Sequence, residues 1–280
     1  MNANMTSGNF STRPIETLNQ MSGFAPSAAR LRNPFKLREE ILPFTVRLVR
    51  NEETLNKAVQ VRHSAYARHL PVFAETLKEP EATDFDDGVV VLLAESKLDG
   101  SPLGTMRIQT NQYKPLSLEH SVNLPELMRD RFLAETTRLA VTNEKTGRMV
   151  KVALIKAGFQ FCELESIDVM VLAARAPLDR HYGRMLFEDV YPGMGYIPMA
   201  HANNVLHRVM ACEIGTARAR AEAEQHPLFD FFYTTYHADI DIEGDLAYAP
   251  GPNLVRNDYI SSMPAMYQMP IVFDAQRIGF

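Results

Sequence analysis

The chain has 280 residues, 46% of them hydrophobic and 22% charged, which is the composition of an ordinary globular protein and argues against a disordered chain. Its formal net charge of −5 argues against a nucleic-acid-binding protein, because phosphate binding needs an excess of Lys and Arg on at least one face. No apolar run reaches the roughly 18 residues that span a bilayer, and residues 1–33 hold no apolar signal core, so we expect a cytoplasmic protein with no integral membrane span.

The first regular elements are a strand and a helix. Residues 1–42 are rich in Asn, Ser, Thr, Pro and Met without a period, which predicts an irregular arm. Residues 44–50 alternate as a strand does. Asn51 is a suitable N-cap and the acidic residues 52–53 favour the helix dipole, so a helix is predicted from there to about Leu70.

An arginine lies within the apolar stripe of this helix. Leu55, Val59, Arg62 and Tyr66 recur at helical spacing and share one face. A buried guanidinium is costly unless it is paired, so Arg62 is expected to meet a carboxylate. The loop over residues 84–88 carries three aspartates.

A hairpin follows this loop. Residues 89–94 form an apolar run, residues 98–102 contain turn formers and residues 103–110 form a second run, which predicts two antiparallel strands. A helical, partly polar segment around 116–131 and a strand over 132–141 are expected next.

Helices and strands then alternate along the chain. No repeat is present, and the order of elements predicts an α/β protein with a mixed (α+β) sheet and helices on both faces. The expected division is an irregular N-terminal arm over 1–42, one domain over 43–237 and a C-terminal extension over 238–280 that packs on it. The remaining predicted elements are a helix over 145–164, a strand over 168–174, a helix over 179–187, an extended segment over 196–201, a strand over 207–214 and a helix over 215–227.

Charged side chains interrupt two of the predicted strands. Arg107, Glu135 and Arg138 lie in apolar, β-prone segments, where an unpaired charge costs several kcal/mol. We therefore expect each of them to have a partner, a ligand or a role in a reaction.

Histidine and cysteine spacing predicts no metal site. His201 and His207 lack a convincing third ligand. Cys162 and Cys212, the only cysteines, are too far apart to suggest a zinc site and are expected to be buried thiols.

Two short segments are rich in basic side chains with few acids nearby. Such patches suit an acidic partner or a phosphate, and a solvated helix face is the alternative interpretation. One contains Arg175, Arg180, His181 and Arg184, and the other contains Arg148, Lys151 and Lys156.

Four short motifs in this order resemble those of the acyl-homoserine-lactone synthases and the related N-acyl amino acid synthases. They are residues 61–66, the aspartates of 84–87, residues 104–107 and residues 135–138, within a likeness that covers roughly 45–200. Both families are branches of the GNAT acyltransferase superfamily. The resemblance implies a GNAT-like acyltransferase fold, with helices on both faces of a twisted, splayed sheet.

The two branches differ in features that this chain shows. Homoserine-lactone synthases usually carry a tryptophan after the first helix and a tighter acidic motif, whereas this chain has no Trp and reads Thr-Asp-Phe-Asp-Asp-Gly at 83–88. The long arm and the segment 116–133 look more like N-acyl amino acid synthases. A lactone synthase using S-adenosylmethionine, and a catalytically silent module that binds acyl chains or acyl carrier protein, remain the alternatives.

The resemblance implies an enzyme that moves a long-chain acyl group from acyl carrier protein to the amine of an amino acid. The donor would be the acyl-phosphopantetheine of that partner, with no separate cofactor. Residues 143–148 contain one glycine only, which fits a pantetheine with one phosphate better than a diphosphate.

Glu135 and Arg138 are the predicted catalytic residues. Glu135 could accept the amine proton directly or through water if burial raises its pKa, or it could instead neutralise Arg107 or Arg138. On a regular strand residues 135 and 138 point to opposite faces. Since GNAT-like strands commonly carry a β-bulge here, we expect one over 136–139, with a freed backbone N–H as oxyanion donor.

The resemblance also implies the binding residues. Met149, Val152, Met170, Leu172 and Phe187 are candidate walls for the acyl chain, and most of them are expected to be ordinary core residues. Substrate binding is assigned to Arg62, Tyr66, Asp84, Asp86, Asp87 and Arg107, with structural pairing as the alternative for Arg62 and the aspartates. Contacts to pantetheine or the carrier protein are assigned to Arg148, Lys151, Arg180 and Arg184.

Overall fold

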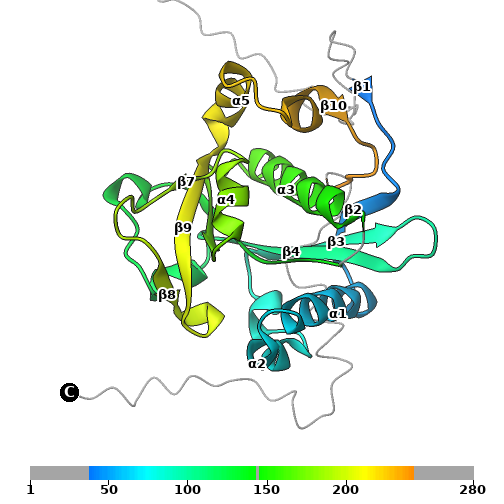
Figure 1. Cartoon of the computed structure of the whole chain (residues 1–280), viewed down its shortest axis with the longest axis horizontal. Coiled ribbons are helices and arrows are strands. Elements are labelled where there is room, and N and C mark those ends of the chain that lie inside the picture. Colours follow the sequence, from blue (N-terminus) through cyan, green and yellow to red (C-terminus); the bar gives the residue numbers. More distant parts are fainter. Residues whose placement is uncertain (1–37, 143–144, 243–280) are drawn as a thin grey trace, which may run out of the picture. The chain divides into compact units, whose positions relative to one another are not determined.

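The computed structural model describes residues 38–142 and 145–242. Its main feature is an eight-stranded sheet in the order β2-β3-β4-β5-β6-β9-β7, with β8 paired to β9 beside this path (Figure 1). β5 and β6 are parallel, and the other neighbours are antiparallel. The strands are β2 (Phe44–Leu48), β3 (Val89–Ser96), β4 (Pro102–Thr110), β5 (Leu133–Val141), β6 (Val169–Ala174), β7 (Glu188–Asp189), β8 (Ile197–Met199) and β9 (Val205–Glu213).

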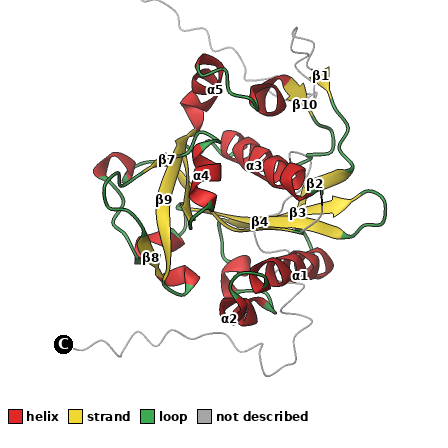
Figure 2. Ribbon diagram, viewed as in Figure 1, coloured by secondary structure: helices red, strands yellow, loops and turns green. Residues whose placement is uncertain are grey.

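Helices cover both faces of this sheet. Figure 2 shows α1 and α2 on one side of β3 and β4, and α3 on the other. The arrangement confirms the expected mixed α/β sheet. The helices are α1 (Glu52–Ala67), α2 (Pro71–Ala74), α3 (Gly147–Leu164), α4 (Leu178–Gly183) and α5 (Ile214–Ala223).

Short turns and one small strand pair complete the described part of the chain. β1 (Arg38–Glu39) pairs in parallel with β10 (Thr235–Tyr236), a pairing that the sequence did not predict. The expected arm and extension lie mostly outside the described residues, so the division of the chain stays a prediction. The short turns are η1 (Glu75–Leu77), η2 (Ala82–Phe85), η3 (Ser117–His120), η4 (Glu126–Met128), η5 (Ala200–Ala202) and η6 (Asp230–Thr234).

The start of α1 is the one that the sequence predicts. The side chain of Asn51 accepts a hydrogen bond from the backbone N–H of Thr54 at 2.9 Å, and the Thr54 hydroxyl accepts one from the N–H of Asn51 at 3.4 Å. Both bonds satisfy donors that the first helical turn leaves free. The helix ends at Ala67, before the predicted Leu70, because Pro71 disfavours a helical backbone at the residue that precedes it.

Two predicted helices are shorter than expected. The segment 116–131 forms only the turns η3 and η4, since Pro125 interrupts it. The helix expected over 179–187 ends at Gly183, and Leu186 then adopts a positive φ of 70°. Both departures leave turns and loops where longer helices were predicted.

The glycine of the 104–107 motif allows α3 to approach the sheet. A Cβ added at Gly104 would lie 2.6 Å from Cγ1 of Val150 and 3.1 Å from Cδ1 of Leu154. Both side chains are fully buried in the main core, so neither can move aside without disturbing it. The motif therefore has a packing role on one face of β4 while Arg107 serves the other.

A β-bulge interrupts β5 where we expected one. Arg107 is opposite Thr137, but Thr105 is opposite Ala140, so β5 contains one residue more than β4 between these pairs. Arg138 lies inside the bulge with a φ of 55°, in the left-handed region. The expected irregularity over 136–139 is confirmed.

The sheet also splays beyond the bulge. β5 pairs with β6 only from Leu133 to Thr136, and Thr136 is opposite Leu172. β5 continues to Val141 and β6 to Ala174 without further pairing between them. The two strands thus diverge toward their carboxyl ends, as expected for a splayed sheet.

Candidate active site

A cavity of about 240 Å³ lies where β5 and β6 diverge. Its walls come from α1, α2, β5, α3, β6, α4, η5 and β9, and they combine apolar with basic side chains. The apolar part includes Ala65, Leu70, Phe73, Leu139, Ala140, Ala173, Leu178 and Met185, and the polar part includes Tyr66, Arg68, His69, Arg138, Lys151, Arg175, His181, Tyr182, His201 and His207.

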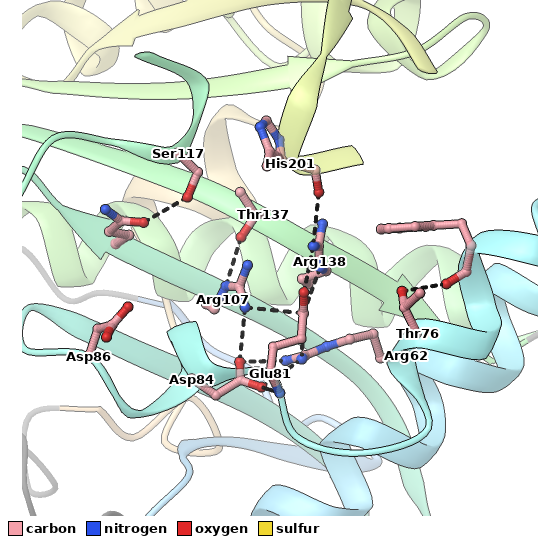
Figure 3. A network of polar contacts seen from close by, with 12 residues as sticks. Arg62, Thr76, Glu81, Asp84, Asp86, Arg107, Ser117, Thr137, Arg138 and His201 are labelled. Atoms are coloured by element: carbon pink, nitrogen blue, oxygen red, sulfur yellow. Dashed lines mark hydrogen bonds and ion pairs between the residues drawn. The ribbon is translucent and has the colours of Figure 1, made fainter. Parts of the chain in front are cut away.

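Arg62 meets a carboxylate, as the helix stripe predicted. Its Nη1 and Nη2 donate to the two oxygens of Asp84 at 2.8 and 3.0 Å, and the Arg62 side chain is fully buried (Figure 3). Such a bidentate pair fixes the loop that carries Asp84 against α1. Arg62 does not line the cavity, which favours the structural alternative for this residue.

Glu81 is the centre of the charged network, and the sequence did not single it out. Its Oε2 accepts from Nη1 of Arg62 at 3.0 Å and Nη1 of Arg107 at 3.1 Å. Arg138 donates to both oxygens, from Nε at 2.7 Å and from Nη2 at 2.6 Å (Figure 3). Burial by itself raises the pKa of Glu81, but Arg138, Arg107 and Arg62 together lower it to about 2.

Arg107 supports this network from β4. Its Nε donates to the Thr137 hydroxyl at 3.0 Å, and its Nη1 also donates to Asp84 at 3.2 Å. The network, defined as Arg62, Glu81, Asp84, Arg107 and Arg138, holds three guanidinium groups and two carboxylates. It therefore carries one excess positive charge behind the cavity wall.

Glu135 stands apart from this network. Among the described residues, no hydrogen bond or ion pair joins Glu135 to Arg107 or Arg138, although the charges of both arginines favour its ionised form. Oε2 accepts from the N–H of Leu118 at 3.1 Å, while Oε1 is buried without a hydrogen bond. Burial raises the pKa of Glu135 to about 7, although the Leu118 N–H and the charge of Arg107 oppose the rise.

The bulge brings Arg138 to the face that carries Glu135. Arg107 is opposite Thr137 and Gln109 is opposite Glu135, so these four side chains share the α1 face of the sheet. Regular alternation would point Arg138 to the α3 face. Its left-handed backbone instead directs the guanidinium to Glu81, on the α1 face.

His201 lies beside Glu135 and lines the cavity, whereas Glu135 does not. The Nε2 of His201 is 3.8 Å from Oε1 of Glu135, and its Nδ1 is buried without a hydrogen bond. Burial and the charge of Arg138 lower the pKa of His201 to about 4. In the sequence, His201 stands out only as a possible metal ligand, and its separation of 63 residues from Arg138 hides the contact between them.

The three loop aspartates have different surroundings. Asp84 belongs to the network, Asp86 forms an ion pair with Lys114, and Asp87 is exposed. Only Asp84 is therefore brought to the predicted site. Tyr66 lines the cavity and its ring meets Phe73 edge to face.

The residues predicted to contact pantetheine or the carrier protein divide into two groups. Lys151 lines the cavity, and burial followed by the charge of Arg148 lowers its pKa, so the two cations are close. Arg180 and Arg184 are exposed on α4 and just after it, and do not line the cavity. His181 does line it, and its pKa is lowered by burial and by the charges of Lys151 and Arg184.

One expectation about neighbouring residues is wrong, and one set of candidates lies outside the cavity lining. Lys156 is buried and donates to the carbonyls of Phe231 and Thr235, so it does not belong to a basic surface patch. The candidate acyl-chain walls do not line the cavity, because Met170, Leu172 and Phe187 belong to the closed core. Met149 is exposed, and Val152 is half-buried outside the lining.

The part of the chain that the structure describes holds neither a metal site nor a membrane-spanning helix. No three His, Cys, Asp or Glu side chains in residues 38–142 and 145–242 gather as a metal site requires. Within the same residues, no helix has the length and apolar character needed to cross a membrane.

Comparisons with known proteins agree with the resemblance seen in the motifs. The family described as N-acyl amino acid synthase FeeM matches residues 57–209, more than half of the chain. No curated protein matches this chain.

Several solved structures are similar in fold. The structure of FeeM, an N-acyl amino acid synthase from uncultured soil microbes, is 14% identical, with a TM-score of 0.49 over 67% of this chain and 97% of that one. A CoA-dependent acyl-homoserine lactone synthase is 15% identical, with a TM-score of 0.46 over 73% of this chain and 98% of that one. An aminoglycoside 6'-acetyltransferase type Ii is 13% identical, with a TM-score of 0.40 over 59% of this chain and 94% of that one.

Proposed function

Because this chain belongs to the FeeM family of N-acyl amino acid synthases and is thus an acyltransferase, we propose that it moves a long-chain acyl group from acyl carrier protein to the amine of an amino acid. The donor in this proposal is the acyl-phosphopantetheine thioester of the carrier protein, and no separate cofactor takes part. The proposal keeps the cytoplasmic location expected from the sequence.

The observation that carries the proposal is the cavity between the diverging strands, with a buried carboxyl behind it. Residues Thr137 to Val141 of β5 line this cavity and have no β6 partner. An extended pantetheine arm has amide groups that can pair with such an open strand edge, in the manner of an added strand. The apolar walls would then receive the acyl chain.

Acyl transfer needs a positioned carbonyl, a neutral amine and a donor for the oxyanion. The amine nitrogen forms a bond to the thioester carbon, and the bond from that carbon to sulfur breaks. The sulfur leaves with the bonding electrons and becomes the free thiol of pantetheine. A backbone N–H at the bulge, at Arg138 or Leu139, is proposed to donate to the oxyanion, because both residues lack a register partner on β4.

Glu135 is proposed as the final acceptor of the amine proton. A carboxyl with a pKa of about 7 is poised to exchange protons near neutral pH, whereas an ordinary glutamate is a weaker base. Its complete burial is the physical reason for this strength.

Basic side chains in and near the cavity could bind the two charged substrates. The excess positive charge of the network, with Arg138 in the cavity wall, suits the carboxylate of an amino acid. Lys151 with neighbouring Arg148 suits the single phosphate of pantetheine, and Arg180 and Arg184 suit the acidic surface of a carrier protein.

The test is an incubation of the full chain with octanoyl, myristoyl or palmitoyl acyl carrier protein and the standard amino acids, followed by mass spectrometry. We expect an N-acyl amino acid and free carrier-protein thiol, with the Arg148→Ala/Lys151→Ala double variant less active at limiting donor. A lactone formed in the presence of S-adenosylmethionine would contradict the proposal, as would equal use of the matching acyl-CoA.

A further inference from the structure

We propose that His201 is the catalytic residue that takes the proton from the attacking amine and passes it to Glu135. This inference rests on the proposed function. It assigns to the two side chains separate roles, with His201 touching the substrate and Glu135 placed behind it as a positioning residue and terminal proton acceptor.

His201 is open to the cavity and Glu135 is not. Glu135 is fully buried and does not line the cavity, so an amine held there has no direct path to its carboxyl. His201 does line the cavity, and its side chain is 15% exposed. The imidazole is therefore the group that an amine in the cavity can reach.

Glu135 and His201 each have a buried polar atom without a hydrogen bond. Oε1 of Glu135 and Nδ1 of His201 are both buried without a hydrogen bond, and Nε2 of His201 is 3.8 Å from that same Oε1. Buried polar atoms are nearly always paired, because leaving one unpaired costs free energy. An unpaired Oε1 beside Nε2 of His201 is what a proton path between the two side chains would leave open between turnovers.

The surrounding structure holds the backbone of His201 in place. The turn η5, which carries His201, is held by the Ser121 hydroxyl, which accepts from the N–H of Ala200 at 2.9 Å. Arg138 donates from Nη2 to the His201 carbonyl at 3.1 Å (Figure 3). The bulge that directs Arg138 therefore also positions His201.

The charges around the imidazole favour a relay over a stored proton. Arg138 and Arg107 face it from the sheet, His207 faces it from β9, and the Ser117 backbone faces it from η3. Apart from Glu135, the charged groups are cationic, and with burial they disfavour an imidazolium. An imidazole that accepts the amine proton on Nε2 therefore does not keep it, and the proton passes to the more basic carboxylate of Glu135.

The step balances as follows. The bond between the amine nitrogen and the acyl carbon forms while the amine proton moves to Nε2 of His201, and from Nε2 the proton passes to the carboxylate of Glu135. The bond to sulfur breaks, and its electron pair leaves as thiolate, which gains a proton to become the thiol. Glu135 then returns its proton to solvent or to that sulfur.

The activity test uses the full chain with palmitoyl acyl carrier protein and a mixture of the standard amino acids, and follows the release of the carrier-protein thiol. We expect His201→Gln to lower the rate at least about 100-fold, the usual scale of a lost general base. The matched control is His63→Gln on α1, outside the cavity lining, which is expected to keep the wild-type rate. Added imidazole should partly restore His201→Ala but not His201→Ala/Glu135→Gln.

Retention of the wild-type rate and pH profile by His201→Gln would overturn the inference, and Glu135 would then act without His201. If the wild-type chain releases no thiol, the proposed function fails, and a second measurement decides the inference. In ¹⁵N-histidine NMR spectra of the full chain, the His201 resonances should move as Glu135 ionises near its pKa of about 7, and should not do so in Glu135→Gln. Identical titrations in the two proteins would refute the coupling.

Discussion

Two charged groups on the α1 face of the sheet differ in how completely their polar atoms are paired. In the network of Arg62, Glu81, Asp84, Arg107 and Arg138, each carboxylate accepts several hydrogen bonds from guanidinium groups. In the pair formed by Glu135 of β5 and His201 of η5, two buried atoms have no hydrogen bond. Both oxygens of each network carboxylate accept hydrogen bonds, although Nε of Arg62 is buried without one, and paired carboxylates favour a brace that holds one geometry. A carboxylate oxygen without a partner, as in Glu135, favours a site where a proton moves.

The comparison is tested most strongly by removing the centre of the network. Glu81→Gln would leave three guanidinium groups around one carboxylate, and we expect it to lower the free energy of unfolding by about 3–5 kcal/mol. Urea denaturation at neutral pH measures this, with the exposed Glu79→Gln as the control. Equal unfolding free energies for Glu81→Gln and the wild type would show that the network is not a brace.

Glu135 is expected to lower stability as the pH rises. Its folded pKa is raised from 4.5 to about 7, so folding carries no penalty below the unfolded value, and the full penalty is present once the pH exceeds about 7. At about pH 8 this amounts to about 3 kcal/mol. The stability of Glu135→Gln relative to the wild type should therefore increase between about pH 5 and about pH 8, as measured by urea unfolding.

A constant difference between Glu135→Gln and the wild type across that range would mean that Glu135 has an ordinary pKa. The distinction between a paired network and a buried carboxyl with a raised pKa would then no longer hold. The exposed Glu79→Gln offers the control, because it removes an acid outside the network and outside the cavity.

Within the network, the hydrogen bond from Arg107 to Thr137 should have a smaller effect. Thr137→Val removes the acceptor at 3.0 Å from a charged donor, and we expect a loss of about 1.5–3 kcal/mol. Thermal or urea unfolding checks this, with Thr45→Val on β2 as the matched control. A loss no greater than that of the control would indicate that Arg107 finds its support elsewhere.

The smallest effect is expected at the loop aspartate outside the network. Asp86 pairs with Lys114 at a partly exposed position, where ion pairs contribute about 0–1 kcal/mol. Asp86→Asn should therefore leave both stability and acyl transfer close to wild type, while Asp84→Asn should not. Loss of transfer in Asp86→Asn with unchanged unfolding would place this aspartate in substrate binding after all.

The sequence predicted those features whose signal is local or periodic. Arg62 stands out because it interrupts an apolar helix stripe, and the hairpin stands out by its two apolar runs and a turn. The bulge near Arg138 came from the resemblance to GNAT-like strands, since nothing in the residues 136–139 by themselves requires it. Gly104 was visible as a motif, but its packing role needed the position of α3.

Glu81 and His201 could not be found in the same way. Glu81 lies in a short acidic loop without a period, 19 residues from Arg62 and 57 from Arg138, and only the fold brings these groups together. His201 belongs to a single short turn whose neighbours come from β5 and η3. Contacts between distant loops depend on the packing of the whole sheet, which local patterns do not encode.

The most direct test of the central claim is the pH dependence of acyl transfer from palmitoyl acyl carrier protein to the amino acids, in the wild type and in Glu135→Gln. The account predicts that the wild-type rate rises with pH through a midpoint near the Glu135 pKa of about 7, and that Glu135→Gln is slow with no such midpoint. Equal rates and equal pH profiles for the two proteins would contradict it.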